Sequence, residues 1–224
     1  MKYTTLLLDL DETLFDFSKS EKFAIDKLME KYNIPVTEEN RRLYSKINDE
    51  KWKKLERGEL TRPQLFRERF DDFFKKTGVT ADTDEANLSY MRFLSQASFI
   101  LDGALETCKK LSEKYSIYLV TNGTKIVQKG RLSGSPIMKY IKDVFISEEI
   151  GFNKPQKEYL DYVLAHSEEK DKTKILVVGD SLSSDIAGAE NSGLDSCWVN
   201  RKNQKNVSDA TYTISCITEI LNIL

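Results

Sequence analysis

The order of hydrophobic and polar positions predicts two kinds of region at the start of the chain. The first is a short apolar run over residues 5–10, with acidic side chains at Asp9 and Asp11. A continuous apolar run of this length is typical of a parallel strand that is buried on both faces. From Phe15 to about Ser98, apolar residues recur at helical spacing and no convincing strand is found. The pattern therefore predicts a strand followed by a long helical region.

The helical region divides at proline and glycine positions into four segments. The helices are predicted over residues 18–32, 37–57, 61–78 and 82–95. Ser18 or Ser20 is the candidate cap of the first helix, and Leu88, with Met91 and Leu94, is a candidate apolar position of the last. A region of this length is far too long for an ordinary loop. We therefore predict an inserted all-helical cap domain over residues 15–99, with a core made of residues 1–14 and 100–224.

Beyond residue 100, predicted helices and strands alternate. Helices are expected over residues 102–114, 125–133, 156–166 and 184–192, and strands over residues 117–120, 144–147, 174–178, 195–199 and 211–214, before a closing helix. This alternation is typical of βαβ units and a parallel sheet. The predicted fold class is α/β, a doubly wound parallel sheet of Rossmann type with an inserted all-helical cap. The cap directly follows the strand that carries Asp9 and Asp11.

Composition and charge narrow the classes of partner. The chain has 224 residues, of which 40% are hydrophobic and 31% charged, as in an ordinary globular protein. Its net charge of −2 gives no bulk attraction to a nucleic acid polymer or an anionic membrane. An anionic substrate must therefore be held by a local site. No apolar stretch approaches the length of a membrane span and no secretory leader pattern is found, so we expect a cytoplasmic protein.

The cysteine and histidine positions exclude several kinds of site. Cys108, Cys197 and Cys216 lack the spacing of a zinc site, and free thiols are expected. His166 is the one histidine, so a histidine-rich metal site is excluded and a Ser-His-Asp triad is disfavoured. It lies in a charged helical stretch, which favours a role on the surface.

Asp9 and Asp11 are the first candidate functional residues. Side chains two positions apart on a strand point to the same side, roughly 6.7 Å apart if the strand stays extended. Ligands of open α/β sheets bind beyond the carboxyl ends of the strands, where this pair is placed. Two carboxylates on one side repel each other unless a cation binds between them, and Mg2+ prefers such oxygen ligands. The alternative is a polar strand end with two solvated acids.

Polar residues also follow the other predicted strands. They are Thr121 and Asn122, then Lys154, then Asp180 and Asp185. Each alone has a simpler interpretation: Thr-Asn-Gly as a turn, Lys154 as a surface lysine, and the stretch from Gly179 to Asp185 as a helix cap. Together they supply a carboxylate nucleophile, a proton-transfer group, ligands for a phosphoryl oxygen, and a lysine to neutralise charge. Their order and their position at strand ends favour phosphoryl transfer.

The same residues resemble the motifs of the haloacid dehalogenase superfamily of phosphohydrolases. The motifs in order are Asp9-Leu-Asp11-Glu-Thr13, Thr121-Asn122, Lys154-Pro155 and Gly179-Asp180-Ser-Leu-Ser-Ser-Asp185. The resemblance implies that Asp9 is the nucleophile and Asp11 the general acid and base. It also implies that Mg2+ is bound by the carboxylates of Asp9 and Asp180 and by the main-chain carbonyl of Asp11.

The remaining motif residues have roles implied by the same resemblance. Thr121, the Asn122 amide and Lys154 would hold the phosphoryl group. Asp185 would orient Lys154 or a metal-bound water, with direct ligation left open. Dehalogenases of the superfamily lack the second aspartate, so Asp11 favours phosphate esters over carbon-halogen bonds.

Several stretches further resemble bacterial pyrimidine 5'-nucleotidases that act on non-canonical nucleotides. They are Leu-Asp-Leu-Asp-Glu-Thr-Leu-Phe-Asp-Phe, Ile-Ser-Glu-Glu-Ile-Gly-Phe-Asn-Lys-Pro, Gly-Asp-Ser-Leu-Ser-Ser-Asp-Ile and Asn48-Asp-Glu-Lys-Trp52. This resemblance implies a nucleoside monophosphate as the small-molecule substrate, and we expect a monomer or homodimer. Phe17, Asn48 and Trp52 in the cap are candidates to contact the base or sugar, although packing inside the cap is the commoner role of a tryptophan.

Other functions stay open at this stage. Among enzymes they are a phosphatase for phosphoglycolate or a sugar phosphate and a β-phosphoglucomutase-like transferase. A phospho-acceptor signalling domain uses similar groups, but it needs neither the cap nor a second aspartate two residues after the acceptor. A catalytically silent binding protein on the same fold is disfavoured by the intact Asp9, Asp11, Lys154 and Asp180.

Overall fold

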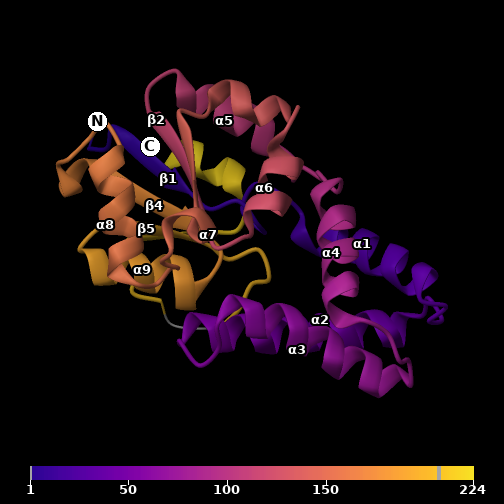
Figure 1. Ribbon diagram of the computed structural model, residues 1–224. Helices are drawn as coiled ribbons and strands as arrows, with labels where there is room; N and C mark the ends of the chain where they lie inside the picture. Colours follow the sequence, from indigo (N-terminus) through magenta and orange to yellow (C-terminus); the bar gives the residue numbers. More distant parts are fainter. Residues whose placement is uncertain (1, 206–207) are drawn as a thin grey trace.

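A six-stranded parallel sheet forms the centre of the protein in the computed structural model, which describes residues 2–205 and 208–224 (Figure 1). The strands are β1 (Thr5–Leu8), β2 (Ser116–Thr121), β3 (Asp143–Ile146), β4 (Ile175–Gly179), β5 (Asp195–Val199) and β6 (Tyr212–Ile214). Their order across the sheet is β3-β2-β1-β4-β5-β6, with every pairing parallel. The first strand of the chain thus lies between β2 and β4, at the point where the strand order reverses direction.

Helices cover both faces of this sheet, which explains the unbroken apolar run of β1. Leu6 and Leu8 pack into one cluster, whereas Leu7 packs into another on the opposite face. The first face is covered by α5 (Ala104–Ser112) and the 3-10 helices η1 (Pro136–Tyr140) and η4 (Ile217–Asn222), and the second by α8 (Lys157–His166) and α9 (Ala187–Ser192). Successive strand residues point to opposite faces, so both need apolar side chains. The predicted α/β fold class is confirmed.

Four helices between β1 and β2 pack against one another away from the sheet, at the lower right of Figure 1. They are α1 (Phe17–Lys31), α2 (Glu38–Glu56), α3 (Arg62–Thr77) and α4 (Thr83–Ser95). Tyr44 of α2 lies within 5.2–5.7 Å, between ring centroids, of Phe70, Phe73 and Tyr90. Val127 of α6 (Lys125–Leu132) belongs to the same hydrophobic cluster. The cap therefore has its own apolar core and rests on α6.

Two chain segments connect the helices to the sheet, and they lie side by side. The Asp16 amide donates to the Phe99 carbonyl at 2.8 Å, and the Leu101 amide donates to the Leu14 carbonyl at 2.9 Å. Phe15 and Ile100 form an antiparallel bridge between these bonds. The chain therefore enters and leaves the four helices through two adjacent, hydrogen-bonded segments. The cap boundaries at residues 15 and 99 remain a prediction.

Several details differ from the sequence-based expectations. The helix α1 begins at Phe17 because the Asp16 side chain, rather than Ser18 or Ser20, caps it by accepting from the Lys19 amide. Leu88 is exposed, since Tyr90, Met91 and Leu94 form the buried side of α4. A turn of π-helix, η3 (Leu182–Ile186), precedes α9, and the closing helix η4 is a 3-10 helix.

Other expectations agree with the structure. Cys108, Cys197 and Cys216 are free thiols. His166 is exposed and stacks on Tyr162, with ring centroids 4.0 Å apart. Among the helices of the described residues, none is long and apolar enough to cross a membrane.

Candidate active site

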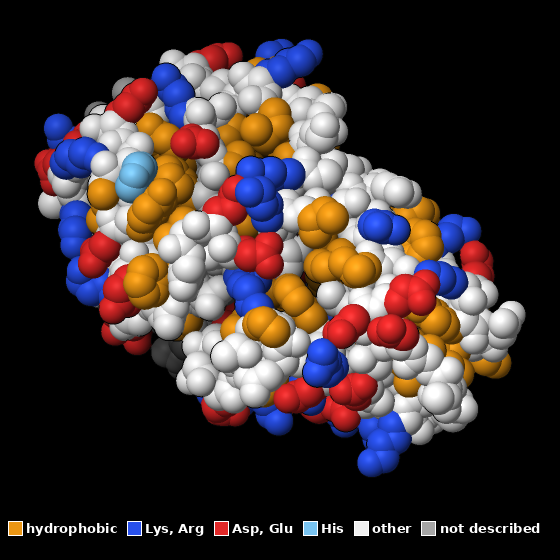
Figure 2. Space-filling model, in the orientation of Figure 1, with side chains coloured by type: hydrophobic (Ala, Val, Ile, Leu, Met, Phe, Trp, Pro, Cys, Tyr) orange, Lys and Arg blue, Asp and Glu red, His pale blue; other side chains and the backbone are white. Residues whose placement is uncertain are grey.

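The residues that follow the strand ends line one cavity of about 440 Å³ between the sheet and the cap. Small-molecule sites occupy about 300–1,000 Å³. The cavity is lined by all ten residues singled out above, namely Asp9, Asp11, Thr121, Asn122, Lys154, Asp180, Asp185, Phe17, Asn48 and Trp52. Figure 2 shows side chains of both charge signs on the outer face, with a hollow near its middle where hydrophobic side chains gather. The structure therefore brings the core and cap candidates together.

Asp9 lies just beyond β1 and is almost completely buried. Its amide donates to the Val178 carbonyl at 2.8 Å, which keeps the residue beside β4. Burial raises the pKa of Asp9 well above its ordinary value; the Lys154 ammonium opposes this rise, and the carboxylates of Asp185 and Asp180 add to it. An anion at this position therefore needs positive partners.

Lys154 supplies one of these partners. Its buried ammonium donates to Asp9 Oδ1 at 2.7 Å, to Asp185 Oδ1 at 2.6 Å and to the Val120 carbonyl at 2.8 Å. Burial alone would lower the pKa of Lys154, but the two carboxylates outweigh it and raise the pKa above the ordinary value. The lysine is thus held as a fixed positive charge beside the Asp9 carboxylate.

Asn122 fixes the main chain around Lys154. Its side-chain Oδ1 accepts from the Lys154 amide at 2.8 Å, and its Nδ2 donates to the Lys154 carbonyl at 2.9 Å. Both ends of the side-chain amide therefore serve this contact. The main-chain amide of Asn122 is then the better candidate for a phosphoryl ligand, and the side chain is a positioning group.

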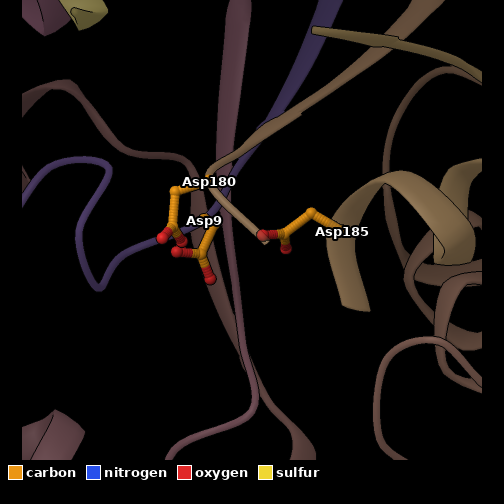
Figure 3. A group of neighbouring side chains, drawn as sticks. All are labelled: Asp9, Asp180 and Asp185. Atoms are coloured by element: carbon orange, nitrogen blue, oxygen red, sulfur yellow. The ribbon is translucent and has the colours of Figure 1, made fainter. Parts of the chain in front are cut away.

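Asp9, Asp180 and Asp185 form a cluster of carboxylates (Figure 3). One oxygen from each lies within 4.8 Å of the others. Burial, followed by the charges of Asp185 and Glu12, raises the pKa of Asp180 to about 7. Trp198 is buried and donates its indole N–H to the Asp180 carbonyl at 2.8 Å. Three carboxylates face the single ammonium of Lys154, so the cluster has an excess of negative charge and the hard oxygen donors that Mg2+ prefers.

Asp185 reaches this cluster because the residue before Asp180 has no side chain. A Cβ atom added to Gly179 would lie 2.2 Å from Asp185 Cγ, so only glycine leaves room for the carboxylate there. Asp185 Oδ1 accepts from Lys154, and Oδ2 accepts from the Ser181 amide at 3.0 Å. With both oxygens engaged, Asp185 is well placed to orient Lys154.

Asp11 is placed differently from the expectation for an extended strand. The strand β1 ends at Leu8, and the chain turns at Glu12, whose φ of 60° is left-handed. Among the described residues, the acidic cluster is completed by Asp180 and Asp185 rather than by the side chain of Asp11. A cation between the Asp9 and Asp11 carboxylates stays a prediction, as does its ligation by the main-chain carbonyl of Asp11.

Two residues of α6, which the sequence did not single out, hold the Asp11 carboxylate. Arg131, completely buried, donates to Asp11 Oδ1 at 2.5 Å, and Gln128 donates to Asp11 Oδ2 at 2.9 Å. The Gln128 amide also donates to Thr121 Oγ1 at 2.8 Å. Gln128 can reach both residues because Gly123 has no side chain. A Cβ atom at that position would lie only 2.2 Å from Gln128 Nε2. The spacing of Gln128 and Arg131 on one helix face was the available signal.

Arg131 also contacts the connection to the cap. Its Nε donates to the Ala97 carbonyl at 3.2 Å, and its carbonyl accepts from Ser98 Oγ at 2.8 Å. Ser20 of α1 donates to the same Ala97 carbonyl at 2.9 Å. The group that orients Asp11 is therefore bonded to the segment by which the cap joins the core.

The cap residues expected to contact substrate occupy different positions on the cavity wall. Phe17 and Trp52 are partly exposed, whereas Asn48 is buried. Arg62 at the start of α3 lies 5.6 Å from the Trp52 ring centroid and donates to the Asn122 carbonyl at 3.0 Å. Trp52 is therefore part of the cavity wall. Packing inside the cap core, the commoner role of a tryptophan, is not what the structure shows for this residue.

The family model of haloacid dehalogenase-like hydrolases matches residues 3–193. The HAD-hydrolase YfnB of Bacillus subtilis is 37% identical over 225 residues, covering 100% of this chain and 96% of that protein. A crystal structure of YfnB bound to magnesium, which reveals interdomain movement, has a TM-score of 0.94 and covers 100% of this chain and 99% of that chain.

Two further relatives carry a named activity. The pyrimidine 5'-nucleotidase PynA of Streptococcus pneumoniae is 32% identical over 227 residues, covering 100% of this chain and 96% of that protein. The pyrimidine 5'-nucleotidase YjjG of Escherichia coli is 29% identical over 226 residues, covering 100% of this chain and 99% of that protein. These matches extend over the cap as well as the core.

Proposed function

The chain belongs to the haloacid dehalogenase-like hydrolases, and on this premise we propose that it is a Mg2+-dependent phosphatase of pyrimidine nucleoside 5'-monophosphates. The observation that carries the proposal is that Asp9 and Lys154 line the same cavity of about 440 Å³ as Phe17, Asn48 and Trp52 of the cap. Two relatives named as pyrimidine 5'-nucleotidases, matched over their whole length, support the choice of substrate.

The chemistry proceeds in two steps in this proposal. A carboxylate oxygen of Asp9 attacks phosphorus, the bond to the ester oxygen breaks, and Asp11 gives its proton to the departing nucleoside. Water then attacks the aspartyl-phosphate, loses a proton to Asp11, and releases phosphate. Lys154, Thr121 and the main-chain amide of Asn122 hold the phosphoryl oxygens during both steps. Gln128 and Arg131 fix the direction of the Asp11 carboxylate.

The carboxylates of Asp9 and Asp180 and the main-chain carbonyl of Asp11 would hold the Mg2+ ion. Three neighbouring carboxylates concentrate negative charge in one place and offer the oxygen ligands that a hard cation such as Mg2+ prefers. When bound, the ion lowers the repulsion between the substrate phosphate and this acidic wall. Asp185 keeps Lys154 in place beside the phosphoryl group.

A substrate panel tests the proposed function. Phosphate release is measured with Mg2+ for UMP, dUMP, dTMP, CMP, AMP and GMP, and for phosphoglycolate and ribose 5-phosphate. We expect the pyrimidine nucleotides to have a kcat/KM at least about tenfold above those of the purine nucleotides and of ribose 5-phosphate, because the cap wall contacts the base. Ribose 5-phosphate is the matched control, since it keeps the 5'-phosphate and sugar and lacks the base.

Three results would contradict the proposal in different ways. Equal turnover of purine and pyrimidine nucleotides would remove the base preference. Release confined to phosphoglycolate or sugar phosphates would keep the phosphatase and discard the nucleotidase. No release from any of the esters would contradict the hydrolase function itself and favour a β-phosphoglucomutase-like transferase or a silent binding protein.

A further inference from the structure

A chain of buried polar side chains crosses the cap wall of the cavity. Asn48 Nδ2 donates to Glu21 Oε1 at 3.0 Å, Arg69 Nη1 donates to Asn48 Oδ1 at 3.0 Å, and Arg69 Nη2 donates to Asn87 Oδ1 at 2.6 Å. Glu21, Asn48 and Arg69 all line the cavity and are 8%, 1% and 3% exposed. Charged residues are almost never buried to this degree unless they are paired, so the arrangement calls for a reason.

The network leaves hydrogen-bonding capacity at the cavity wall. Each terminal nitrogen of Arg69 carries two N–H groups, and the bonds to Asn48 and Asn87 use one N–H on each. Arg69 Nε is enclosed in the cap, where the guanidinium lies over the Phe70 and Tyr90 rings.

The Glu21 carboxylate accepts from Asn48 and also hydrogen-bonds Ser45, which lines the same cavity. Its two oxygens offer about four acceptor sites, so capacity remains for a ligand. A donor from Arg69 and an acceptor from Glu21 thus border the same cavity.

The surrounding residues suit a flat, neutral ring. Trp52 and Phe17 supply aromatic surface, and Met91 and Leu94 supply aliphatic surface on the same cavity. The positive charge of Arg69 is balanced by the negative charge of Glu21 through Asn48. Asp49 adds a further negative charge near Glu21 on the same cavity. This end of the cavity therefore has no excess of positive charge to attract a second anionic group such as the carboxylate of phosphoglycolate. The anionic group of the substrate is expected at the opposite wall, beside Lys154.

We propose that Glu21 and Arg69, held in place by Asn48, form the site that recognises the hydrogen-bonding edge of a uracil-type base. Glu21 accepts from the ring N3–H, and Arg69 donates to a neighbouring ring carbonyl. This inference rests on the proposed nucleotidase function and extends it, since it assigns base recognition to two charged residues. Asn48 becomes a positioning residue, because its amide is used within the protein.

The closest test is Glu21→Gln, which keeps the size of the side chain. Its oxygen can still accept from Asn48, but an NH2 group then faces the base where the carboxylate was. Uracil has a donor at N3 and cytosine an acceptor, so the variant reverses the match. Burial raises the pKa of Glu21 to about 7, so the assay is run at pH 8.5, where the carboxylate is ionised.

We expect kcat/KM for UMP to fall about ten- to hundredfold in Glu21→Gln, with a smaller loss or a gain for CMP. Ribose 5-phosphate should change by less than about twofold, since it has no base. Glu30→Gln makes the same chemical change on the exposed side of α1, where Glu30 pairs with Lys27, and should leave all three values unchanged. An unchanged ratio of UMP to CMP in Glu21→Gln would overturn the inference.

A second measurement needs no variant. The wild-type protein is compared on UMP and on 3-methyluridine 5'-monophosphate, which lacks the N3–H. We expect the methylated nucleotide to be at least about tenfold poorer in kcat/KM. Equal values would overturn the inference while leaving the nucleotidase proposal intact. If the wild-type protein instead hydrolyses ribose 5-phosphate with the same kcat/KM as UMP, the proposed nucleotidase function fails. The experiment therefore distinguishes failure of the base-recognition site from failure of the proposed function.

Discussion

Replacing Asp9 with asparagine is expected to abolish phosphate release from UMP, with kcat reduced by at least about 10⁴-fold. An amide has no anionic oxygen to attack phosphorus, so the first step of the proposed mechanism is lost. The fold should remain intact because asparagine has the same shape and because Lys154 keeps its contact with Asp185. Removing one of three clustered carboxylates also relieves repulsion, so unfolding in the absence of metal should need as much urea as in the wild type, or more.

A matched variant separates the chemistry from general damage. Asp26→Asn makes the same change on α1, where Asp26 pairs with Arg41 and Lys22 outside the cavity. It should keep kcat within about twofold of the wild-type value. Wild-type turnover by purified Asp9→Asn protein would show that Asp9 is not the nucleophile.

Lys154→Met is expected to reduce both stability and activity strongly. Methionine fills a similar volume but leaves the buried carboxylates of Asp9 and Asp185 without the ammonium that lies 2.7 and 2.6 Å from them. Removing one partner of a buried ion pair typically costs about 3–5 kcal/mol of unfolding free energy. Substrate binding should weaken as well, so KM rises and kcat falls together. Urea unfolding in EDTA and steady-state kinetics with Mg2+ measure the two effects.

Lys51→Met provides the comparison for this variant. Lys51 is also nearly buried and lies between two acids, with its ammonium 2.8 Å from Glu68 and 2.9 Å from Asp72, but inside the cap. It should lower stability while leaving kcat within about twofold. If Lys154→Met lost no more activity than Lys51→Met, the proposed role of Lys154 in holding the phosphoryl group would be wrong.

The strand ends were the part of the site that the sequence predicted well. Parallel strands bring their carboxyl ends to one edge, so Asp9, Thr121, Lys154 and Asp180 could be expected together without knowing the strand order. The apolar run of β1 and the alternation after residue 100 were sufficient for the fold class. Both the apolar run and the alternation of helices and strands are local sequence patterns, and the folded protein keeps the elements that they predict.

The position of Asp11 could not be predicted in the same way. It depends on the turn at Glu12 and on Arg131, which lies 120 residues further along the chain. The spacing of Gln128 and Arg131 indicates one helix face, but it does not show that this face is buried against Asp11. Its position results from the packing of α6 between the sheet and the cap.

Charged residues inside the cap were missed for a related reason. Glu21, Lys51 and Arg69 lie in helices rich in charge, where a solvated face is the usual expectation. Their burial depends on partners from other helices, such as Asn48 for Glu21 and Arg69. In the structure Asn48 and Ile47 both lie on the buried side of α2. The helical period cannot show which polar residues of different helices meet there.

Metal dependence of UMP hydrolysis tests the central claim most directly. Phosphate release by the purified wild-type protein is followed after EDTA treatment, then after Mg2+ is added back in excess. The cluster of Asp9, Asp180 and Asp185 predicts negligible release in EDTA and full recovery with Mg2+, because the anionic substrate cannot approach uncompensated carboxylates. Equal release from UMP in EDTA and in Mg2+ would contradict the proposed magnesium-dependent mechanism.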